Sequence, residues 1–399
     1  MTASGNRGMM GHLANLNEER RTLQETARQF AMQEVLPLAN ELDPLKQDIP
    51  DELIRKLAAL GYFGIMIPRT YGGLGLGVFE YCLVSEALSR AWMSVASIIA
   101  RGNGMMVQAH FSAEQRERYL PRMARGDLIG AFALSEAEAG SDVANISCQA
   151  TRAGDTWIIN GEKKWCGHAL KADFIVLFAR SSPSPDPRRR HLGISAFLIE
   201  KERGVFPPGL SGTPIDKIGY HGLTTWNLTF KDFPVSASAL VGPEGQGFKC
   251  AMSGLDIGRA HTAARALGLA QGALEDALVY ARQRVQFGQP IAAFQAIRFK
   301  LAEMATQVEA ARHFTYYVAD QLDSGRRCDM EAAMVKLFAS EMAERVTSEA
   351  LQVLGGNGYT TDYAVERHWR DARLTRIFEG TSEIQKLVIS DRLLGDSLT

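Results

Sequence analysis

The segment Gly154-Asp-Thr-Trp-Ile-Ile-Asn-Gly-Glu-Lys-Lys-Trp165 shows that this chain of 399 residues contains a β region. Residues 156–159 are β-branched or aromatic, and turn dipeptides stand on both sides of them, Gly154-Asp155 and Asn160-Gly161. A short strand between two tight turns is therefore expected. Further strand candidates follow over residues 174–178, 194–199 and 226–230.

Helical periodicity appears on both sides of this β region. Asn17 can cap a first helix with an acidic first turn, and Pro37 is expected to end that helix. The long apolar periods after residue 254 favour helices packed lengthwise. Expected helices before the strands cover 51–60, 78–90 and 113–124, and those after the strands cover 256–286, 294–324 and 330–354.

The sequence thus predicts an α+β fold that is mainly α. An N-terminal helical domain (16–130) is followed by a small middle β domain, barrel-like or a sandwich (131–245), and by a C-terminal four-helix bundle (246–399). The polar, Gly-rich residues 1–15 are interpreted as a flexible leader without the apolar core of a secretory signal.

Composition excludes several kinds of partner. The 44 Lys and Arg nearly balance the 45 Asp and Glu, so no bulk positive field attracts nucleic acid or an anionic membrane. No run is long and apolar enough to span a bilayer. Five widely spaced cysteines offer neither a disulfide framework nor a metal site, which favours a reducing compartment, the cytoplasm.

The segment Arg373-Leu-Thr-Arg-Ile-Phe-Glu-Gly-Thr-Ser-Glu-Ile-Gln385 places a carboxylate, Glu379, just ahead of an expected helix. Gly380 permits backbone conformations closed to other residues, and Ser382 with Gln385 is expected to form a capping box. Taken alone, the segment fits two interpretations of Glu379: a general base, or a polar residue at a helix entrance.

The order of domains, ending in Glu-Gly-Thr, resembles the acyl-CoA dehydrogenase family of flavoproteins over about residues 13–394. The segment Leu134-Ser-Glu-Ala-Glu-Ala-Gly-Ser-Asp142 is similar to the family pattern T/S-E-P-x-A-G-S-D, and residues 160–165 are similar to N-G-x-K-x-W-I-T, whose Trp lies against the flavin. Ala137 replaces the usual Pro. Cys166 and Gly167 replace Ile and Thr or Ser, so a hydroxyl near the reactive flavin nitrogen is missing.

Three later segments also resemble family motifs. Ser253-Gly-Leu-Asp-Ile-Gly-Arg259 resembles the segment near acyl-CoA, although Asp256 and Arg259 also fit a surface ion pair. Arg282-Gln-Arg-Val-Gln-Phe-Gly-Gln-Pro290 resembles R-x-x-F-G, which reaches FAD of a neighbouring subunit, although a helix end closed by glycine and proline explains it too. Gln352-Val-Leu-Gly-Gly-Asn-Gly-Tyr359 matches Q-x-x-G-G-x-G.

The resemblance implies binding sites for FAD and for acyl-CoA, and no metal site. Implied FAD contacts are Phe132, Leu134, Ser135, Ser141, Trp165, Arg284, Phe287, Gln295, Gln352, Gly355, Gly356, Thr381 and Glu383. Implied acyl-CoA contacts are Ser141, Asp256, Arg259, Phe378 and Gly380.

The implied reaction is α,β-dehydrogenation of an acyl-CoA thioester to a trans-2-enoyl-CoA in fatty acid metabolism. Glu379 would take the α-proton and the flavin would take the β-hydrogen as hydride. An electron-transferring flavoprotein is the expected electron acceptor, and a homo-oligomer, usually a tetramer, is the expected assembly. Alternatives are a flavin monooxygenase or oxidase of the same fold, and a non-catalytic acyl-CoA-binding protein.

The acyl chain is left open by the sequence. The pocket lining is expected near residues 98–107 and near Phe378. Arg101 in that lining would read an acidic or polar acyl tail, but a position facing solvent is the preferred interpretation. His221 stands where relatives often carry Arg, with no consequence assigned to it.

Overall fold

The computed structural model describes residues 16–102 and 108–395, so the expected leader and residues 103–107 of the expected pocket lining lie outside the described chain. Two compact units form it. Unit 1 comprises Met1–Glu41, Gly77–Ala96 and Arg259–Thr399, and unit 2 comprises Leu42–Leu76 and Ser97–Gly258. No helix of the described residues is long and apolar enough to cross a membrane.

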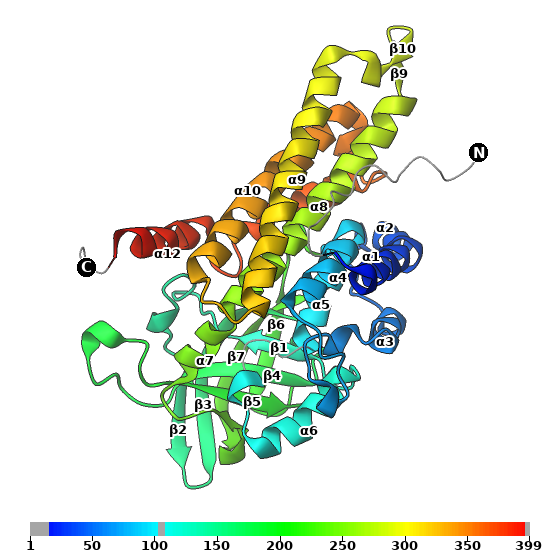
Figure 1. Ribbon diagram of the computed structural model, residues 1–399. Helices are drawn as coiled ribbons and strands as arrows, with labels where there is room; N and C mark the ends of the chain where they lie inside the picture. Colours follow the sequence, from blue (N-terminus) through cyan, green and yellow to red (C-terminus); the bar gives the residue numbers. More distant parts are fainter. Residues whose placement is uncertain (1–15, 103–107, 396–399) are drawn as a thin grey trace. The chain divides into compact units, whose positions relative to one another are not determined.

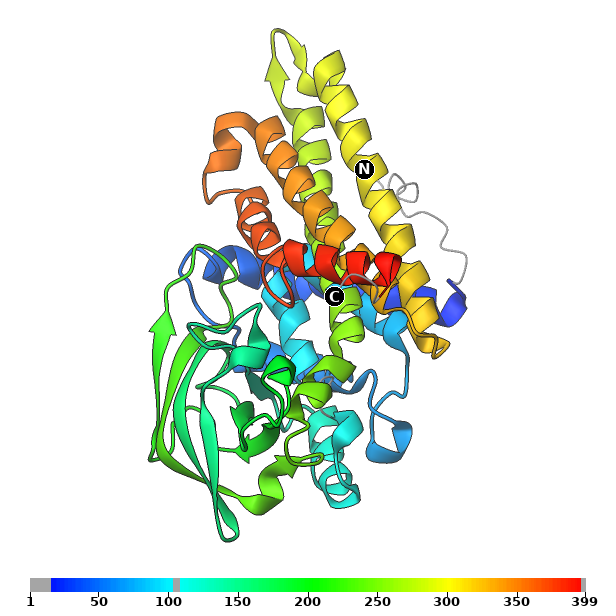
Figure 2. The same cartoon turned by 90° about the vertical axis from the view of Figure 1, so that its left-hand side faces the viewer.

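Unit 2 is built on a mixed sheet, which Figure 2 shows with its green strands side by side. The strand order is β6-β7-β3-β2-β4-β5-β8, and β1 pairs in parallel with β4. The strands are β1 (Gly130–Ala133), β2 (Gln149–Ala153), β3 (Thr156–Gly167), β4 (Phe174–Arg180), β5 (Ile194–Glu200), β6 (Leu210–Ile215), β7 (Thr225–Ser236) and β8 (Leu240–Val241).

The prediction of a turn at Asn160-Gly161 was wrong, because β3 runs through both residues. Its pairing with β7 shifts register between Ile159 and Gly161, so the pair forms a bulge inside a long strand. Gly161 has φ 135°, and a Cβ there would lie 2.7 Å from the Cα of Cys148. The glycine therefore serves a close approach of backbones rather than a chain reversal.

The core of unit 2 lies on the two faces of this sheet. One face buries Trp157, Phe197 and Phe233, and the other packs Phe174, Phe178 and Leu198 with apolar residues of the helices. Those helices are α6 (Ala113–Ala124) and α7 (Gly247–Ser253). Helix α3 (Asp51–Ala59) and the second half of α5 (Met93–Gly102) also belong to this unit.

Unit 1 is a helical bundle, and Figure 1 shows α8, α9 and α10 running lengthwise with a small hairpin at one end. Figure 2 shows α12, in red, lying across them. The helices of the bundle are α8 (Leu255–Gln283), α9 (Gln295–Asp323), α10 (Asp329–Leu354), α11 (Val365–Thr375) and α12 (Ser382–Leu394), with α1 (Glu18–Phe30) and α4 (Val78–Ala91) packed beside them.

The expectation that Pro37 ends the first helix was wrong. Asn17 caps α1 as expected, accepting a hydrogen bond from the backbone N–H of Arg20. The chain then continues through a π-helical turn (Ala31–Val35) into α2 (Leu36–Leu42), which contains the proline. The wider turn shifts the hydrogen-bond partners just before a residue that has no N–H to donate.

The fold class predicted from the sequence is confirmed, since the protein is mainly helical with a mixed sheet in the middle. Its tertiary contacts group the residues into two units, whereas the sequence predicts a succession of three segments. The exact three-domain boundaries stay a prediction.

Candidate active site

Glu379 lies on a sharp turn between α11 and α12 in unit 1. Both Glu379 (φ 54°) and Gly380 (φ 89°) have left-handed backbone conformations. Such a conformation costs little for glycine but is strained for glutamate, and strained residues gather at functional sites. The turn leaves 34% of the Glu379 side chain exposed just before α12, so the predicted place ahead of a helix N-terminus is confirmed.

The predicted Ser382–Gln385 capping box was wrong, because the cap lies one residue earlier. The Thr381 hydroxyl accepts a hydrogen bond from the backbone N–H of Ile384, and α12 begins at Ser382. Ser382 instead donates its hydroxyl hydrogen to Glu341 at 2.7 Å. Threonine and serine both serve as N-caps, so the sequence alone could not choose between neighbours.

The carbonyl of Gly380 is held by two buried side chains, Gln385 and Lys336, of which the sequence did not single out Lys336. Lys336, fully buried on α10, donates from Nζ at 2.6 Å, and Gln385 donates from Nε2 at 2.9 Å. A Cβ on Gly380 would lie 2.5 Å from the same amide nitrogen of Gln385. The turn that carries Glu379 is therefore tied to α10 and to α12.

The carboxylate of Glu379 has two partners on α8. Its Oε2 accepts a hydrogen bond from the Thr262 hydroxyl at 2.8 Å, and its Oε1 pairs with the guanidinium of Arg265. Arg265 is only 2% exposed, and its Cζ lies 4.6 Å from the centroid of the Phe378 ring. The carboxylate of Glu379 therefore lies against a buried cation.

Other cations surround this pair in unit 1. Burial lowers the pKa of Lys336 to about 8, while the nearby Glu379 acts in the opposite direction and Arg265 and Arg259 add to the lowering. Arg259 is 7% exposed on α8, so the interpretation of this residue as a plain surface ion pair was wrong. Asp256 is half-buried one turn earlier in the same helix.

Trp165 forms an exposed aromatic surface in unit 2. It lies in β3 where the pairing with β7 shifts register between Lys163 and Cys166, and its φ of 65° turns it out of the strand. The indole is 56% exposed, although a large apolar ring is usually buried. Trp165 is thus available to a planar ligand.

A buried ion pair joins the two segments that resemble flavin-binding motifs. Lys163 Nζ donates to Glu136 Oε1 at 2.7 Å and to the carbonyl of Leu134 at 3.0 Å, and Lys164 N donates to the carbonyl of Ser135 at 2.8 Å. Glu136 also accepts from Ser147 and Cys148 of the same loop. Glu136 and Lys163 both lie within these motifs, but the resemblance implies no role for either residue.

The preferred interpretation that Arg101 faces solvent was wrong. Its Nη2 lies 2.7 Å from the point where a Cβ of Gly167 would stand, and its Nε is buried. Gly167 therefore leaves room for the guanidinium. The adjacent Cys166 thiol is fully buried, and burial raises its pKa to about 12, which makes it an inert thiol.

Gly167→Ser is expected to displace the Arg101 side chain and to leave the fold intact. The clash falls on the far end of a flexible side chain, so the loss of unfolding free energy should stay within about 1 kcal/mol. Urea unfolding of the wild type, Gly167→Ser and Gly167→Ser/Arg101→Ala measures it. If the double variant were no more stable than the single one, Arg101 would not be the group in the way.

The interpretation of residues 282–290 as a helix end closed by glycine and proline was wrong. Helix α8 ends at Gln283, and β9 (Val285–Gln286) and β10 (Gln289–Pro290) form a hairpin whose two-residue turn is Phe287-Gly288. Both turn residues have positive φ, 51° and 80°. Phe287 is 94% exposed at the tip, next to the ring of Phe294 at 6.0 Å.

The other implied FAD contacts of unit 1 lie on exposed backbone. Gln352 is exposed near the end of α10, and Gly355 and Gly356 follow in a 3₁₀ turn (Gly355–Tyr359). A Cβ at either glycine would meet nothing within 4 Å. Packing within the chain therefore does not explain glycine at 356. Arg284, Gln295 and Glu383 are exposed as well.

The remaining implied contacts of unit 2 lie in β1 and along the loop that follows it. The ring of Phe132 packs at 5.0 Å from that of Phe178. Leu134 and Ser135 are half-buried, and Ser141 is exposed.

The ring of His221 lies against two carbonyl oxygens, those of Asp43 at 3.0 Å and Lys217 at 3.2 Å. His221 is thus part of a turn and is tied to the backbone.

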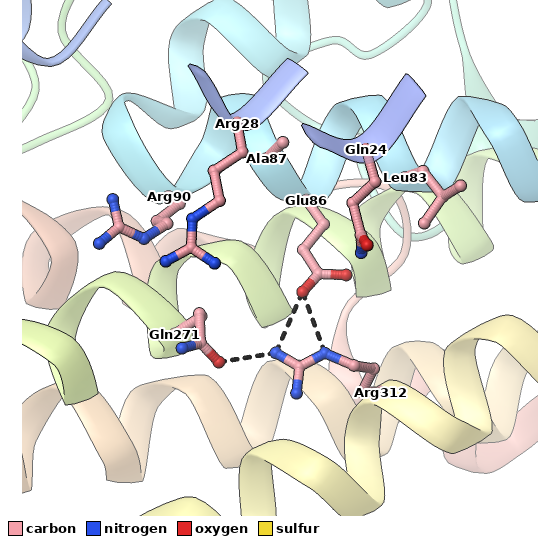
Figure 3. A pocket seen from close by; sticks show the side chains of 8 residues that line it. All are labelled: Gln24, Arg28, Leu83, Glu86, Ala87, Arg90, Gln271 and Arg312. Atoms are coloured by element: carbon pink, nitrogen blue, oxygen red, sulfur yellow. Dashed lines mark hydrogen bonds and ion pairs between the residues drawn. The ribbon is translucent and has the colours of Figure 1, made fainter. Parts of the chain in front are cut away.

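A small cavity in unit 1 is lined by residues other than those described above, and charged side chains of its lining pair with one another (Figure 3). Arg312 donates to Glu86 through two nitrogens at 3.1 Å each and to Gln271 at 2.6 Å. Arg28 pairs with Glu275 at 3.1 Å. Because these side chains satisfy one another, we interpret them as a structural link between α1, α4, α8 and α9.

Domain models of one protein family match three successive parts of the chain. Residues 17–127, 131–233 and 245–394 match the N-terminal, middle and C-terminal domain models of acyl-CoA dehydrogenase. The chain is 42% identical to an acyl-CoA dehydrogenase of Bacillus subtilis, over 96% of this chain and 99% of that protein. It is 41% identical to the human mitochondrial short-chain specific acyl-CoA dehydrogenase, over 95% and 91%.

Among solved structures, butyryl-CoA dehydrogenase from Megasphaera elsdenii superposes with a TM-score of 0.89 at 38% identity, over 96% of this chain and 99% of that one. Fold and relatives together define an FAD-dependent oxidoreductase. The chain belongs to the acyl-CoA dehydrogenase family.

The residues present fit FAD. Trp165 offers an exposed aromatic face, Gly356 offers backbone with open space around it, and Arg284 offers an exposed guanidinium suited to a pyrophosphate. FAD when bound supplies a hydride acceptor. The three features lie in segments whose resemblance to family motifs implies contact with this cofactor.

Proposed function

We propose that this protein oxidises a short-chain acyl-CoA to the trans-2-enoyl-CoA, with Glu379 as the base that removes the α-proton. The observation that carries the proposal is the strained turn of Glu379, which points a partly exposed carboxylate from the N-terminus of α12 and is tied down by Lys336 and Gln385. The substrates named for the human and Megasphaera relatives support a short chain.

The backbone of the same turn supplies a second group. Among the residues that the structure describes, the N–H of Glu379 has no hydrogen-bond partner. An N–H of this kind can donate to the thioester carbonyl as charge develops on it, which makes the α-proton more acidic. We propose that Glu379 thus serves the substrate twice, through its amide and through its carboxylate.

Anaerobic titration with butyryl-CoA tests this function. We expect the absorbance of the bound flavin to bleach within seconds, and the electrons to pass to an electron-transferring flavoprotein faster than to oxygen. Turnover with oxygen alone would instead favour an oxidase or monooxygenase of this fold. A protein that binds acyl-CoA but takes up no FAD would favour a non-catalytic role.

We also propose that the active form is a homo-oligomer, with a tetramer as the first expectation. Phe287 at the tip of the β9–β10 hairpin is 94% exposed, and a large aromatic side chain that extends into solvent fits a contact with a second copy. In such an assembly Arg284 and Phe287 would reach the FAD of a neighbour. The cytoplasm remains the proposed location.

Phe287→Ala is expected to preserve the helical bundle and to weaken FAD binding by roughly 10- to 100-fold, because an aromatic anchor contributes about 1–3 kcal/mol at an interface. Far-ultraviolet circular dichroism measures the helical content, FAD titration measures the affinity, and light scattering measures the oligomeric state. Val279→Ala, on the exposed face of α8, is the matched control. Unchanged FAD affinity in Phe287→Ala would contradict the assignment.

A further inference from the structure

The hydroxyl of Thr262 makes a different hydrogen bond from those of other buried threonines in the helices. A threonine inside a helix can donate to the carbonyl one turn earlier in the same helix. Thr315 on α9 and Thr347 on α10 do so, at 2.8 Å each. Thr262 is fully buried on α8, yet its hydroxyl donates to Glu379 Oε2, 117 residues later in the chain. The hydroxyl of Thr262 therefore serves the proposed base instead of its own helix.

The neighbouring arginine determines the direction of this hydrogen bond. Arg265 Nη2 donates to Thr262 Oγ1 at 2.9 Å, and the same nitrogen contacts Glu379 Oε1. A guanidinium has no acceptor, so the single hydroxyl hydrogen of Thr262 cannot point back at Arg265. It points at Glu379 Oε2, which lies 2.8 Å from Oγ1. The three side chains thus form a closed ring of hydrogen bonds in which the carboxylate accepts at both of its oxygens.

The contact to the second oxygen matters because the carboxylate of a glutamate turns easily. The terminal torsion of this side chain is broad and has no sharply preferred angle. Arg265 Nη2 contacts Oε1, and a contact to one oxygen alone leaves rotation about the Cγ–Cδ bond possible. Thr262 holds the other oxygen, so the two contacts together fix the plane of the carboxylate. Lys336 and Gln385 already fix the backbone of the turn that carries it.

We propose that Thr262 is a positioning residue, which holds the carboxylate of Glu379 in the plane that proton transfer from the α-carbon requires. This inference rests on the proposed function, because Thr262 acts through the proposed base. A reaction depends on the alignment of the reacting atoms, and a misplacement of about 1 Å can slow it about 100-fold. Thr262 itself gains and loses no proton: the α-proton passes to Glu379, and the hydroxyl keeps its own hydrogen.

Paired variants at this position test the inference on the FAD-loaded enzyme. Thr262→Val keeps the shape of the side chain and removes the hydroxyl, whereas Thr262→Ser keeps the hydroxyl. With butyryl-CoA in anaerobic stopped flow, we expect flavin bleaching to be about 10- to 100-fold slower in Thr262→Val and within roughly 3-fold of wild type in Thr262→Ser. If Thr262→Val does not fold, the comparison of Thr262→Ala with Thr262→Ser isolates the same hydroxyl.

Two further measurements distinguish positioning of the base from a general structural role. The dissociation constant of but-2-enoyl-CoA, measured from the flavin spectrum, should stay within roughly 3-fold of wild type in both variants, because the effect falls on the chemical step. In a Glu379→Gln background, Thr262→Val should slow the residual bleaching by no more than about 2-fold, since the carboxylate that it positions is gone.

Thr347→Val is the matched control. Thr347 is also fully buried, and its hydroxyl donates to the Ala343 carbonyl of its own helix, so the variant should bleach at the wild-type rate. A loss in this control as large as that in Thr262→Val would assign the effect to the removal of any buried hydroxyl from the bundle and would overturn the inference.

Three other results would also overturn it. The first is a Thr262→Val enzyme that bleaches as fast as wild type. The second is an equal loss of rate in Thr262→Val and Thr262→Ser, which would assign the effect to side-chain packing on α8. The third is an undiminished effect of Thr262→Val in the Glu379→Gln background, which would show that Thr262 does not act through the base. A wild-type flavin that no acyl-CoA bleaches would instead refute the proposed function itself.

Discussion

Glu379→Gln should slow anaerobic bleaching of the flavin by the best acyl-CoA substrate about 10³- to 10⁴-fold, the upper range for loss of a general base. The amide keeps the size of the side chain and can still accept from Thr262 and Arg265, so FAD and substrate should remain bound. Stopped-flow absorbance measures the rate, and a spectral titration measures binding.

The same variant is expected to be less stable than the wild type. Arg265 is 2% exposed and would face a neutral amide in place of its carboxylate partner, which leaves a buried charge poorly balanced. Glu303→Gln, on the exposed face of α9, is the matched control and should change neither rate nor stability. A rate within a few-fold of wild type would remove Glu379 from its proposed role.

Lys163→Met should lower the free energy of unfolding by about 3–5 kcal/mol, the range for removing one partner of a buried ion pair. The lysine side chain is 0% exposed and that of Glu136 is 7% exposed, so Glu136 would keep its charge in a dry site. Because Lys163 and Lys164 also hold the loop of Leu134 and Ser135, weaker FAD binding should accompany the loss of stability.

The pH dependence of the free energy of unfolding distinguishes the contribution of this ion pair from that of side-chain packing. Burial acts to raise the pKa of Glu136, but Lys163 and the hydrogen bonds from Ser147 and Cys148 outweigh it and hold the pKa below its ordinary value of 4.5. The pair therefore contributes fully above about pH 4.5 and is lost as pH falls through the lower folded value. The stability gap between wild type and variant should shrink over that acid range.

Controls in the same sheet complete the test. Lys231→Met, exposed on β7, should leave chemical denaturation unchanged at every pH. The double variant Glu136→Gln/Lys163→Met should recover part of the lost stability, since no lone charge stays buried. A Lys163→Met protein as stable as wild type would mean that the pair does not hold the loop.

The expectations that the structure overturns concern positions where a residue type has more than one structural use. Asn160-Gly161 has the composition of a hairpin turn but forms a bulge in β3, and Pro37 follows a π-helical turn instead of ending the helix. Arg101 was expected in solvent, yet it fills the space that Gly167 leaves. For Gly161 and Arg101 a partner from another segment, Cys148 and Gly167 respectively, decides which use applies, and the local pattern contains no information about that partner.

The amino-acid order by itself determined the fold class, the family, and the carboxylate placed ahead of the last helix. Periodicity, turn residues and motif spacing are local properties, and they are visible in the sequence alone. Only the tertiary structure decided that Arg265 from α8 meets Glu379, that Lys336 from α10 holds Gly380, and that Lys163 pairs with Glu136. Partners such as Arg265 and Glu379 are 114 residues apart in the chain. Burial makes the loss of either partner of such a pair costly, and burial arises only when these segments pack together.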